Sequence, residues 1–409
     1  MEFQTIERMD AAELALRHAH CREFLQRFAP QAEGLLVFSR VNIYYLTGTL
    51  ANGLFWLPLD GEPVLLSRRG LERAKLESPL EHILSFRSYS DIPGLVKDAG
   101  SPLGKVLAAD MGGLSWSLAN LLQAKLPDHE FVPGDQVLAR SRARKTEWEL
   151  NKMRLCGQRH HQALYHLLPQ KIHAGMTERE ISHAAWDTFF SLGHSGHIRM
   201  NVFGEEIFLG HVAAGDSANY PSVFNGPVGL MGEHPAVPFM GYAGKVWQHG
   251  EALACDIGFG LEGYATDKTQ VYWPGPAASI PDKAKRAHDF CMEIQQWLAD
   301  NAGTGAIPSE LHAHCMDQAE KQGWTEGFMA LDHNKVVFLG HGIGLAIDEF
   351  PPLAKGFDEP LEKGMCLALE PKMGIPGIGM VGCENTFEVT DSGARCITGN
   401  AFNMVCVDG

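Results

Sequence analysis

The sequence predicts an α/β (α+β) protein of two domains, a small one over residues 1–140 and a larger one over residues 141–409. The first observation is length, because 409 residues exceed one ordinary domain. The second is that strand-like and helical segments alternate before residue 140, as in a small α/β domain. The third is the order helices, strands, helices, strands after residue 140, which predicts two similar halves.

Three segments support the smaller domain. Residues 34–40 (GLLVFSR) and 55–67 (FWLPLDGEPVLLS) are apolar and rich in strand-forming residues, and Asp60-Gly61 predicts a turn within the second. Residues 115–126 (SWSLANLLQAKL) have helical periodicity. The polar, basic stretch 139–145 (ARSRARK) then predicts a linker into the larger domain.

Two capping boxes predict where helices of the larger domain begin. In the first, the Thr146 hydroxyl accepts a hydrogen bond from the third helical amide while Glu149 reaches back to the start of the helix. We expect this helix over residues 146–168 and a second helix, opened by the same motif, over residues 177–192. Further helices are expected at 281–300 and 308–322, and strand-rich blocks at about 198–275 and 335–408.

The composition excludes several classes of partner. A formal net charge of -15 argues against nucleic acid, because proteins that bind the phosphate backbone gather positive charge. No apolar run reaches the ~18–20 residues that span a bilayer, and the charged start lacks the apolar core of a secretory signal. Nine scattered cysteines without a CxxC pair indicate reduced thiols. We therefore expect a cytoplasmic protein with neither a nucleic-acid nor a membrane partner.

Two aspartates break the strand pattern of residues 251–273 (EALACDIGFGLEGYATDKTQVYW). Two strand-like arms flank a glycine-containing turn, which predicts a β-hairpin. Asp256 lies in one arm and Asp267 in the other. Aspartate disfavours strands, and burying a lone carboxylate is costly. A shared divalent cation would satisfy both, although for the two aspartates alone a strand end that faces water is the favoured interpretation.

The C-terminal block supplies three more candidate ligands. Glu370 ends an apolar strand before Pro371, Glu384 begins another strand, and His341 lies among glycines that allow close backbone approach. Four carboxylates and one imidazole suit Mn²⁺, Co²⁺, Fe²⁺ or Zn²⁺. Because a carboxylate can bridge two ions, the set indicates a dinuclear centre.

These segments resemble the pita-bread metallopeptidase family of aminopeptidase P, prolidase and creatinase. The resemblance lies in DIGFGLEGYATDKT, GHGIGLAIDEFP, LEP and ENTFEVT over residues 140–409, and in NIYYLTG (42–48), which looks like the family's N-terminal domain. It implies a creatinase-like N-terminal domain and a pita-bread domain with pseudo-symmetric halves. It also implies that Asp256, Asp267 and Glu384 hold one metal ion, and that Asp267, His341, Glu370 and Glu384 hold the other.

The chain departs from the family where its peptidases bind substrate. Asp348 stands seven residues after His341, where these peptidases have a histidine. A second histidine is expected near residues 238–240, which read Pro-Phe-Met here, and Gln270 replaces a usual arginine. Such histidines stabilise the developing charge on the substrate. The metal ligands are therefore retained while the substrate-binding residues are altered.

The resemblance implies a hydrolase of the Xaa-Pro aminopeptidase or dipeptidase type, acting on a short peptide or small molecule through metal-activated water. Glu370 would carry the proton, Asp348 would act on substrate, and the chain would form a homodimer. The alternative is a non-peptidase branch, either a creatinase-like amidinohydrolase or a dimethylsulfoniopropionate-type lyase. A non-catalytic binding module is a third reading, which retention of all five ligands disfavours.

Overall fold

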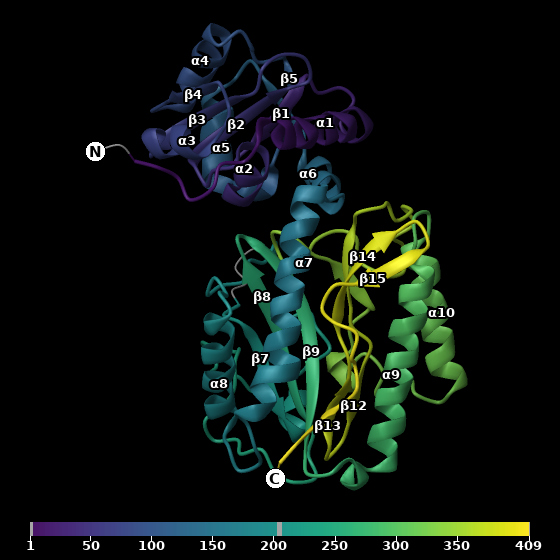
Figure 1. The fold of residues 1–409 in the computed structure, drawn as a ribbon. Coiled ribbons are helices and arrows are strands. Elements are labelled where there is room, and N and C mark those ends of the chain that lie inside the picture. Colours follow the sequence, from purple (N-terminus) through teal and green to yellow (C-terminus); the bar gives the residue numbers. More distant parts are fainter. Residues whose placement is uncertain (1–2, 203–206, 409) are drawn as a thin grey trace. The chain divides into compact units, whose positions relative to one another are not determined.

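The structure is a computed structural model that describes residues 3–202 and 207–408 (Figure 1). It divides into two compact units, Met1–Arg142 and Ala143–Gly409. Among the described residues, none of the helices combines the length and the hydropathy that crossing a bilayer requires.

The first unit is built on a mixed six-stranded sheet of order β4-β3-β2-β1-β5-β6. The strands are β1 (Gly34–Val37), β2 (Asn52–Pro58), β3 (Val64–Arg69), β4 (His82–Ser85), β5 (Val106–Ala109) and β6 (Glu130–Pro133). The helices are α1 (Ala11–Phe28), α2 (Arg40–Thr47), α3 (Leu71–Glu77), α4 (Ile92–Asp98), α5 (Trp116–Lys125) and α6 (Asp135–Ala143). The strands predicted at 34–40 and 55–67 and the helix predicted at 115–126 are confirmed as β1, β2, β3 and α5.

The stretch 139–145 is not the open linker that its composition predicts. Most of it belongs to α6, and its basic side chains have partners. The guanidinium of Arg142 donates to Asn42 Oδ1 at 3.0 Å, and Lys145 Nζ donates to Glu349 Oε2 at 3.1 Å with both side chains buried. These basic residues stabilise the fold, whereas a linker would leave them in water.

The second unit has two helix pairs and two four-stranded sheets. The helices are α7 (Glu147–His161), α8 (Glu178–Ser191), α9 (Asp282–Asn301) and α10 (Pro308–Lys321). One sheet has the order β16-β9-β8-β7, the other has the order β10-β11-β14-β15, and β12 and β13 form a separate hairpin. The strands are β7 (Gly210–Ala214), β8 (Leu253–Leu261), β9 (Tyr264–Pro274), β10 (Gly340–Gly342), β11 (Cys366–Leu369), β12 (Lys372–Ile375), β13 (Gly379–Gly382), β14 (Asn385–Thr390), β15 (Gly393–Cys396) and β16 (Val405–Val407).

Both predicted capping boxes are present, at Thr146 and at Thr177. The first helix changes its winding before its expected end, because a π-helical turn (Gln162–Leu167) and a 3-10 turn (Leu168–Gln170) follow α7. All four predicted helices and the order helices, strands, helices, strands are confirmed. Residues 203–206 of the predicted strand-rich block lie outside the described residues.

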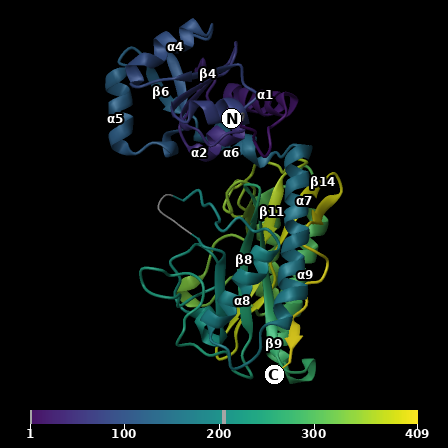
Figure 2. The ribbon, with the colours of Figure 1, turned by 60° about the vertical axis from the view of Figure 1, so that its left-hand side comes forward.

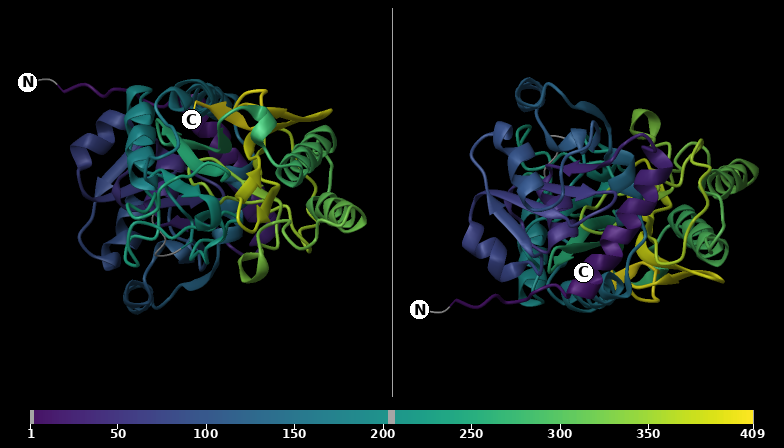
Figure 3. Two further views of the ribbon diagram at one scale, coloured as in Figure 1. Left: turned by 90° about the horizontal axis from the view of Figure 1, so that it is seen from below. Right: turned by 90° about the horizontal axis from the view of Figure 1, so that it is seen from above.

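The helix pairs cover the sheets on their outer sides. Helix α7 packs along β8 and β9 (Figures 1 and 2), while α9 packs on β12, β13 and β15. Figure 3 shows α9 and α10 side by side, both seen nearly end-on. The two sheets meet where β9 contacts β11 and β14, and the Thr269 amide donates to the Glu384 carbonyl there. Polar residues at the centres of these strands are thereby brought face to face.

Candidate metal centre

The β8–β9 hairpin places two carboxylates on one face of its sheet. Asp256 lies in the middle of β8 and pairs with Thr269, while Asp267 on β9 pairs with Gly258. Residues two apart on a strand share a face, so Asp256 and Asp267 are diagonal neighbours on the same side. The Thr269 hydroxyl lies 2.7 Å from Asp256 Oδ1 and 2.9 Å from Glu384 Oε2. This hydroxyl links the hairpin to the C-terminal half.

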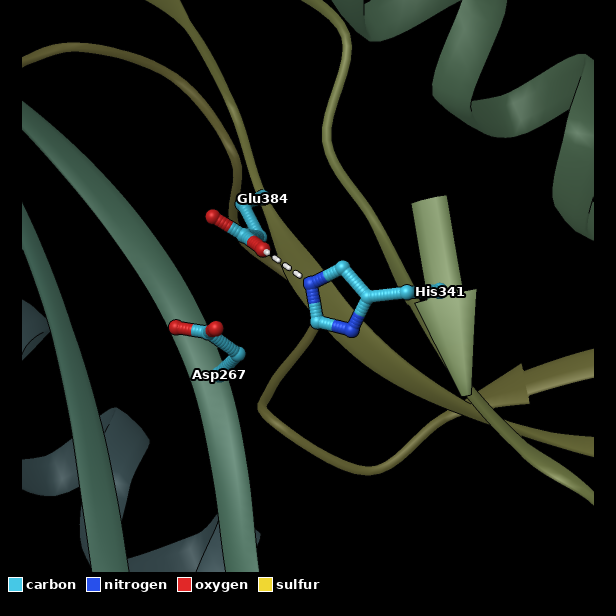
Figure 4. A group of neighbouring side chains, drawn as sticks. All are labelled: Asp267, His341 and Glu384. Atoms are coloured by element: carbon cyan, nitrogen blue, oxygen red, sulfur yellow. Dashed lines mark ion pairs between the residues drawn. The ribbon is translucent and has the colours of Figure 1, made fainter. Parts of the chain in front are cut away.

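The other three candidate ligands come from the opposite half of the unit. His341 is the middle residue of β10, Glu370 directly follows β11, and Glu384 lies between β13 and β14. Glu370 is 3% exposed and Glu384 is 1% exposed. His341 Nε2 lies 3.7 Å from Glu370 Oε1 and 4.0 Å from Glu384 Oε1. Figure 4 shows Asp267, His341 and Glu384 pointing toward one another from three different strands or loops.

The donor set fits a divalent metal ion. One ligand atom each from Asp267, His341 and Glu384 lies within 4.8 Å of the others. Nitrogen and oxygen ligands bind such ions at about 2.0–2.2 Å, so an ion fits between atoms about 4 Å apart. Within the described part of the chain, Glu384 Oε1 is buried and has no hydrogen-bond partner. A cation at this position would satisfy that oxygen.

Burial shifts the pKa values of these carboxyl groups. Burial, with the neighbouring Asp256, raises the pKa of Asp267, and burial together with Asp267 raises the pKa of Glu384. Burial alone would also raise the pKa of Asp256, but the Lys372 ammonium and His211 outweigh it and lower that pKa. Crowded, buried carboxylates of this kind need a compensating positive charge.

All five predicted ligands line one cavity of about 280 Å³. Apolar residues from three separate segments, among them Phe224, Phe338 and Ile347, form part of its wall. A cavity with an apolar wall and convergent polar groups is the usual form of a small-ligand site. Its size suits a short peptide or a small molecule.

Asp348 also lines this cavity, beside the five ligands. Its carboxylate accepts hydrogen bonds from the backbone amides of Asn201, at 2.6 Å, and Val202, at 3.3 Å. Burial raises the pKa of Asp348. The residue therefore lies at this cavity and also accepts hydrogen bonds from the 201–202 segment.

Lys372 is a residue of the site that the sequence reasoning missed. It begins β12, its side chain is 0% exposed, and its Nζ contacts Asp256, Glu370 and Glu384. The spacing from Glu370 could have indicated Lys372 from the sequence. The two residues flank Pro371, and residues two apart in an extended chain point to the same side.

His211 is a second residue that the sequence reasoning missed. It lies on β7, pairs with Asp256 across the sheet, and lines the cavity. Its Nε2 is buried and has no hydrogen-bond partner among the described residues. The segment at 238–240, where the family's second histidine was expected, lies beside it, because Met240 and His211 form a bridge. A histidine thus reaches this part of the cavity from a different strand.

Two family models match the chain. Residues 151–391 match the metallopeptidase family M24, and residues 17–144 match the creatinase/prolidase N-terminal domain. An Xaa-Pro dipeptidase of Pyrococcus furiosus is 26% identical over 360 residues, which cover 88% of this chain and 91% of that protein.

Solved structures match over nearly the full length. An Xaa-Pro dipeptidase from Bacillus anthracis matches with a TM-score of 0.79 and 23% identity, covering 96% of this chain and 100% of that chain. An X-Pro aminopeptidase from Thermotoga maritima matches with a TM-score of 0.74 and 22% identity, covering 95% and 99% respectively. These likenesses identify the fold of both units.

Proposed function

We propose that this chain, which belongs to the metallopeptidase family M24, is an Xaa-Pro dipeptidase or aminopeptidase. The observation that carries the proposal is the convergence of Asp256, Asp267, His341, Glu370 and Glu384 on one cavity. The pita-bread fold, the creatinase-like N-terminal domain and the similarity to Xaa-Pro dipeptidases along most of the chain support the same activity.

Membership of this metallopeptidase family implies that the chain uses divalent metal ions. We propose Mn²⁺, Co²⁺, Fe²⁺ or Zn²⁺, because the oxygen and imidazole donors suit these ions. The five ligands provide enough donors for two ions, but the ammonium of Lys372 lies among the same carboxylates.

In the mechanism, a bound ion supplies Lewis-acid activation of water. Asp267, His341, Glu370 and Glu384 would hold that ion. Glu370 would take the proton from the attacking water and return it to the leaving amine, the role that the family resemblance implies. Its carboxylate is buried and lines the cavity, and Lys372 Nζ, 3.0 Å from Oε2, would hold it in position.

Two further residues would contact the substrate. Asp348 presents a carboxylate to the cavity, which suits a cationic group such as a free peptide amine. His211 pairs with Asp256 across the sheet, and its Nε2, which has no hydrogen-bond partner in the described part of the chain, would donate a hydrogen bond to the scissile carbonyl. Although Asp348 stands where the family resemblance implies a histidine, Asp348 and His211 would still provide polar groups for peptide binding.

A homodimer in the cytoplasm remains our proposal from the sequence. All nine cysteines are unpaired thiols and eight of them are at least half-buried, which agrees with a reducing compartment. Sedimentation of the purified chain tests the dimer directly.

An activity screen tests the proposed function. The purified chain is stripped of metal, reloaded separately with Mn²⁺, Co²⁺, Fe²⁺ or Zn²⁺, and assayed on Xaa-Pro dipeptides, longer Xaa-Pro peptides, creatine and dimethylsulfoniopropionate. We expect metal-dependent cleavage of Xaa-Pro bonds, lost in Glu370→Gln. Turnover of creatine or dimethylsulfoniopropionate without Xaa-Pro cleavage would contradict the proposal and favour the non-peptidase alternative.

A further inference from the structure

We infer that the ammonium group of Lys372 takes the place of one of the two metal ions that the family resemblance implies, so that this chain binds a single divalent ion. The inference rests on the proposed metal centre and concerns how many ions it holds. It follows from the position of one buried lysine among four carboxylates.

Lys372 Nζ lies within hydrogen-bond distance of three proposed ligands. It is 2.6 Å from Glu384 Oε2, 3.0 Å from Glu370 Oε2 and 3.3 Å from Asp256 Oδ2. An ammonium group has three protons to donate, one for each of these carboxylates. Because the lysine side chain is 0% exposed, bulk water does not compete for these contacts.

A metal ion held by Asp256 and Glu384 would need nearly the same position. Oxygen ligands lie about 2.0–2.2 Å from such an ion, which places the ion in the space between these carboxylates that Nζ fills. Two cations forced together there would also repel each other strongly in a buried site. The ammonium and a metal ion at Asp256 therefore exclude each other.

The other half of the centre stays open to one ion. Glu370 Oε1 and Glu384 Oε1, the oxygens that Lys372 does not contact, face His341 Nε2 at 3.7 Å and 4.0 Å. Glu384 Oε1 has no hydrogen-bond partner among the described residues, although it is buried. Asp267 adds a further oxygen from β9. The two oxygens of each glutamate thus serve different cations, one the lysine and one the metal.

The balance of charge agrees with one ion. The four carboxylates, one ammonium and one divalent ion together carry a single negative charge. A second divalent ion beside the ammonium would make the buried cluster positive, whereas two ions alone would neutralise it. Buried charge is tolerated only when it is paired, and the single positive charge of Lys372 supplies half of what a second divalent ion would supply.

The backbone fixes Lys372 at this position. Residue 372 begins β12 and pairs with Gly382 on β13. A Cβ on Gly382 would lie 2.7 Å from the Lys372 Cα, so only glycine allows the two strands to approach this closely. The lysine is therefore held by a paired strand and is not a mobile side chain that reaches in from solvent.

Metal stoichiometry tests the inference. Wild type, Lys372→Met and the control Lys363→Met are loaded with Mn²⁺, freed of excess metal, and compared by metal analysis and electron paramagnetic resonance. Lys363 is a suitable control because its side chain is 67% exposed. We expect one Mn²⁺ per chain, with the spectrum of an isolated ion, in wild type and Lys363→Met. Lys372→Met should bind two ions that are exchange-coupled, because methionine fills the space of the stem without its charge.

Two Mn²⁺ ions per wild-type chain with exchange coupling would overturn the inference. A folded Lys372→Met protein that still binds one ion would also overturn it, and circular dichroism checks the fold. If that variant does not fold, the wild-type stoichiometry alone decides. A two-ion wild type that cleaves Xaa-Pro bonds would refute only this inference, while a one-ion wild type inert toward all Xaa-Pro peptides would refute only the proposed function.

Discussion

Asp348 lines the cavity of the candidate metal centre, and we predict that its charge acts on the substrate. Asp348→Asn should lower kcat/KM on an Xaa-Pro dipeptide by about a hundredfold, the lower end of the range for loss of one acid–base group. The single amide oxygen of asparagine can still accept the 2.6 Å hydrogen bond from the Asn201 amide, and only the longer 3.3 Å contact with the Val202 amide is lost, so the loop should stay in place. Steady-state kinetics measures the effect.

Asp391→Asn is the matched control, because Asp391 is 71% exposed and pairs only with Lys363 among the described residues. Asp391→Asn should leave kcat/KM unchanged. If the chain is an ordinary peptidase, Asp348→His should have activity equal to or above that of wild type. Robust Xaa-Pro cleavage that is unchanged in Asp348→Asn would show that Asp348 only holds the loop.

We predict that buried His288 makes the second unit less stable in acid. The Gly382 amide donates to His288 Nδ1 at 3.0 Å, and Nε2 lies 2.8 Å from the Phe402 carbonyl, so the ring is held neutral. Burial lowers the pKa of His288 to about 4, against about 6.5 when unfolded. Neutral His288 contributes fully to the free energy of unfolding above pH 6.5. This contribution is lost as the pH falls toward 4, because the unfolded chain binds a proton at a higher pH than the folded chain does.

Wild type should therefore lose about 2 kcal/mol more unfolding free energy than His288→Gln between pH 7 and pH 5. Urea unfolding of the two metal-free proteins at both pH values measures this difference, and the other titrating groups cancel in the comparison. An equal pH dependence in both proteins would show that His288 does not carry the effect.

At the scale of elements, strand β10 positions His341 by close contact with β11. A Cβ on Gly340 would lie 2.2 Å from the Ala368 carbonyl oxygen, so Gly340→Ala must push the two strands apart. We expect about tenfold weaker Mn²⁺ binding, as for other changes that displace a ligand from its orientation. Calorimetric titration measures the affinity.

Gly94→Ala serves as the control, since a Cβ there meets nothing within 4 Å. Equal Mn²⁺ affinity in Gly340→Ala and wild type would mean that the spacing of β10 and β11 does not position His341.

The sequence predicts elements well where local signals are strong. Both capping boxes open helices, and the hairpin of residues 251–273 appears as β8 and β9. Helix α1 was not predicted, because its buried face carries charge: Arg17 is 0% exposed and bonds to Glu13 at 2.7 Å. Charged residues on the inner face hide the apolar periodicity on which helix prediction depends.

At the scale of the whole molecule, the position of the domain boundary remains a prediction. We expect it between residues 139 and 145, near the division of the two units at Arg142. Because α6 reaches Ala143, trypsin should cut there slowly in the native protein and faster in mild urea. Mass spectrometry of the fragments identifies the cut site. A metal analysis of the C-terminal fragment shows whether it retains the metal ligands. Fragments that begin within residues 146–409 instead would contradict this boundary.

The sequence predicts the part of the candidate site that residue type and order along the chain reveal. Asp256, Asp267, His341, Glu370 and Glu384 stand out because acids and a histidine interrupt apolar strands, and they line one cavity in the structure. His211 was not readable, because its place beside Asp256 depends on the register of β7 against β8. That register is set by long-range packing, which no local motif encodes.

Metal content is the measurement that tests the account most directly. Wild type, Asp267→Ala and Glu384→Ala are dialysed against Mn²⁺, separated from free metal and analysed for Mn²⁺ per folded chain. Wild type should retain Mn²⁺, whereas each variant should lose it, because both residues contribute to the group of donors that lies within 4.8 Å. Full Mn²⁺ occupancy in both variants would contradict the assignment of this centre.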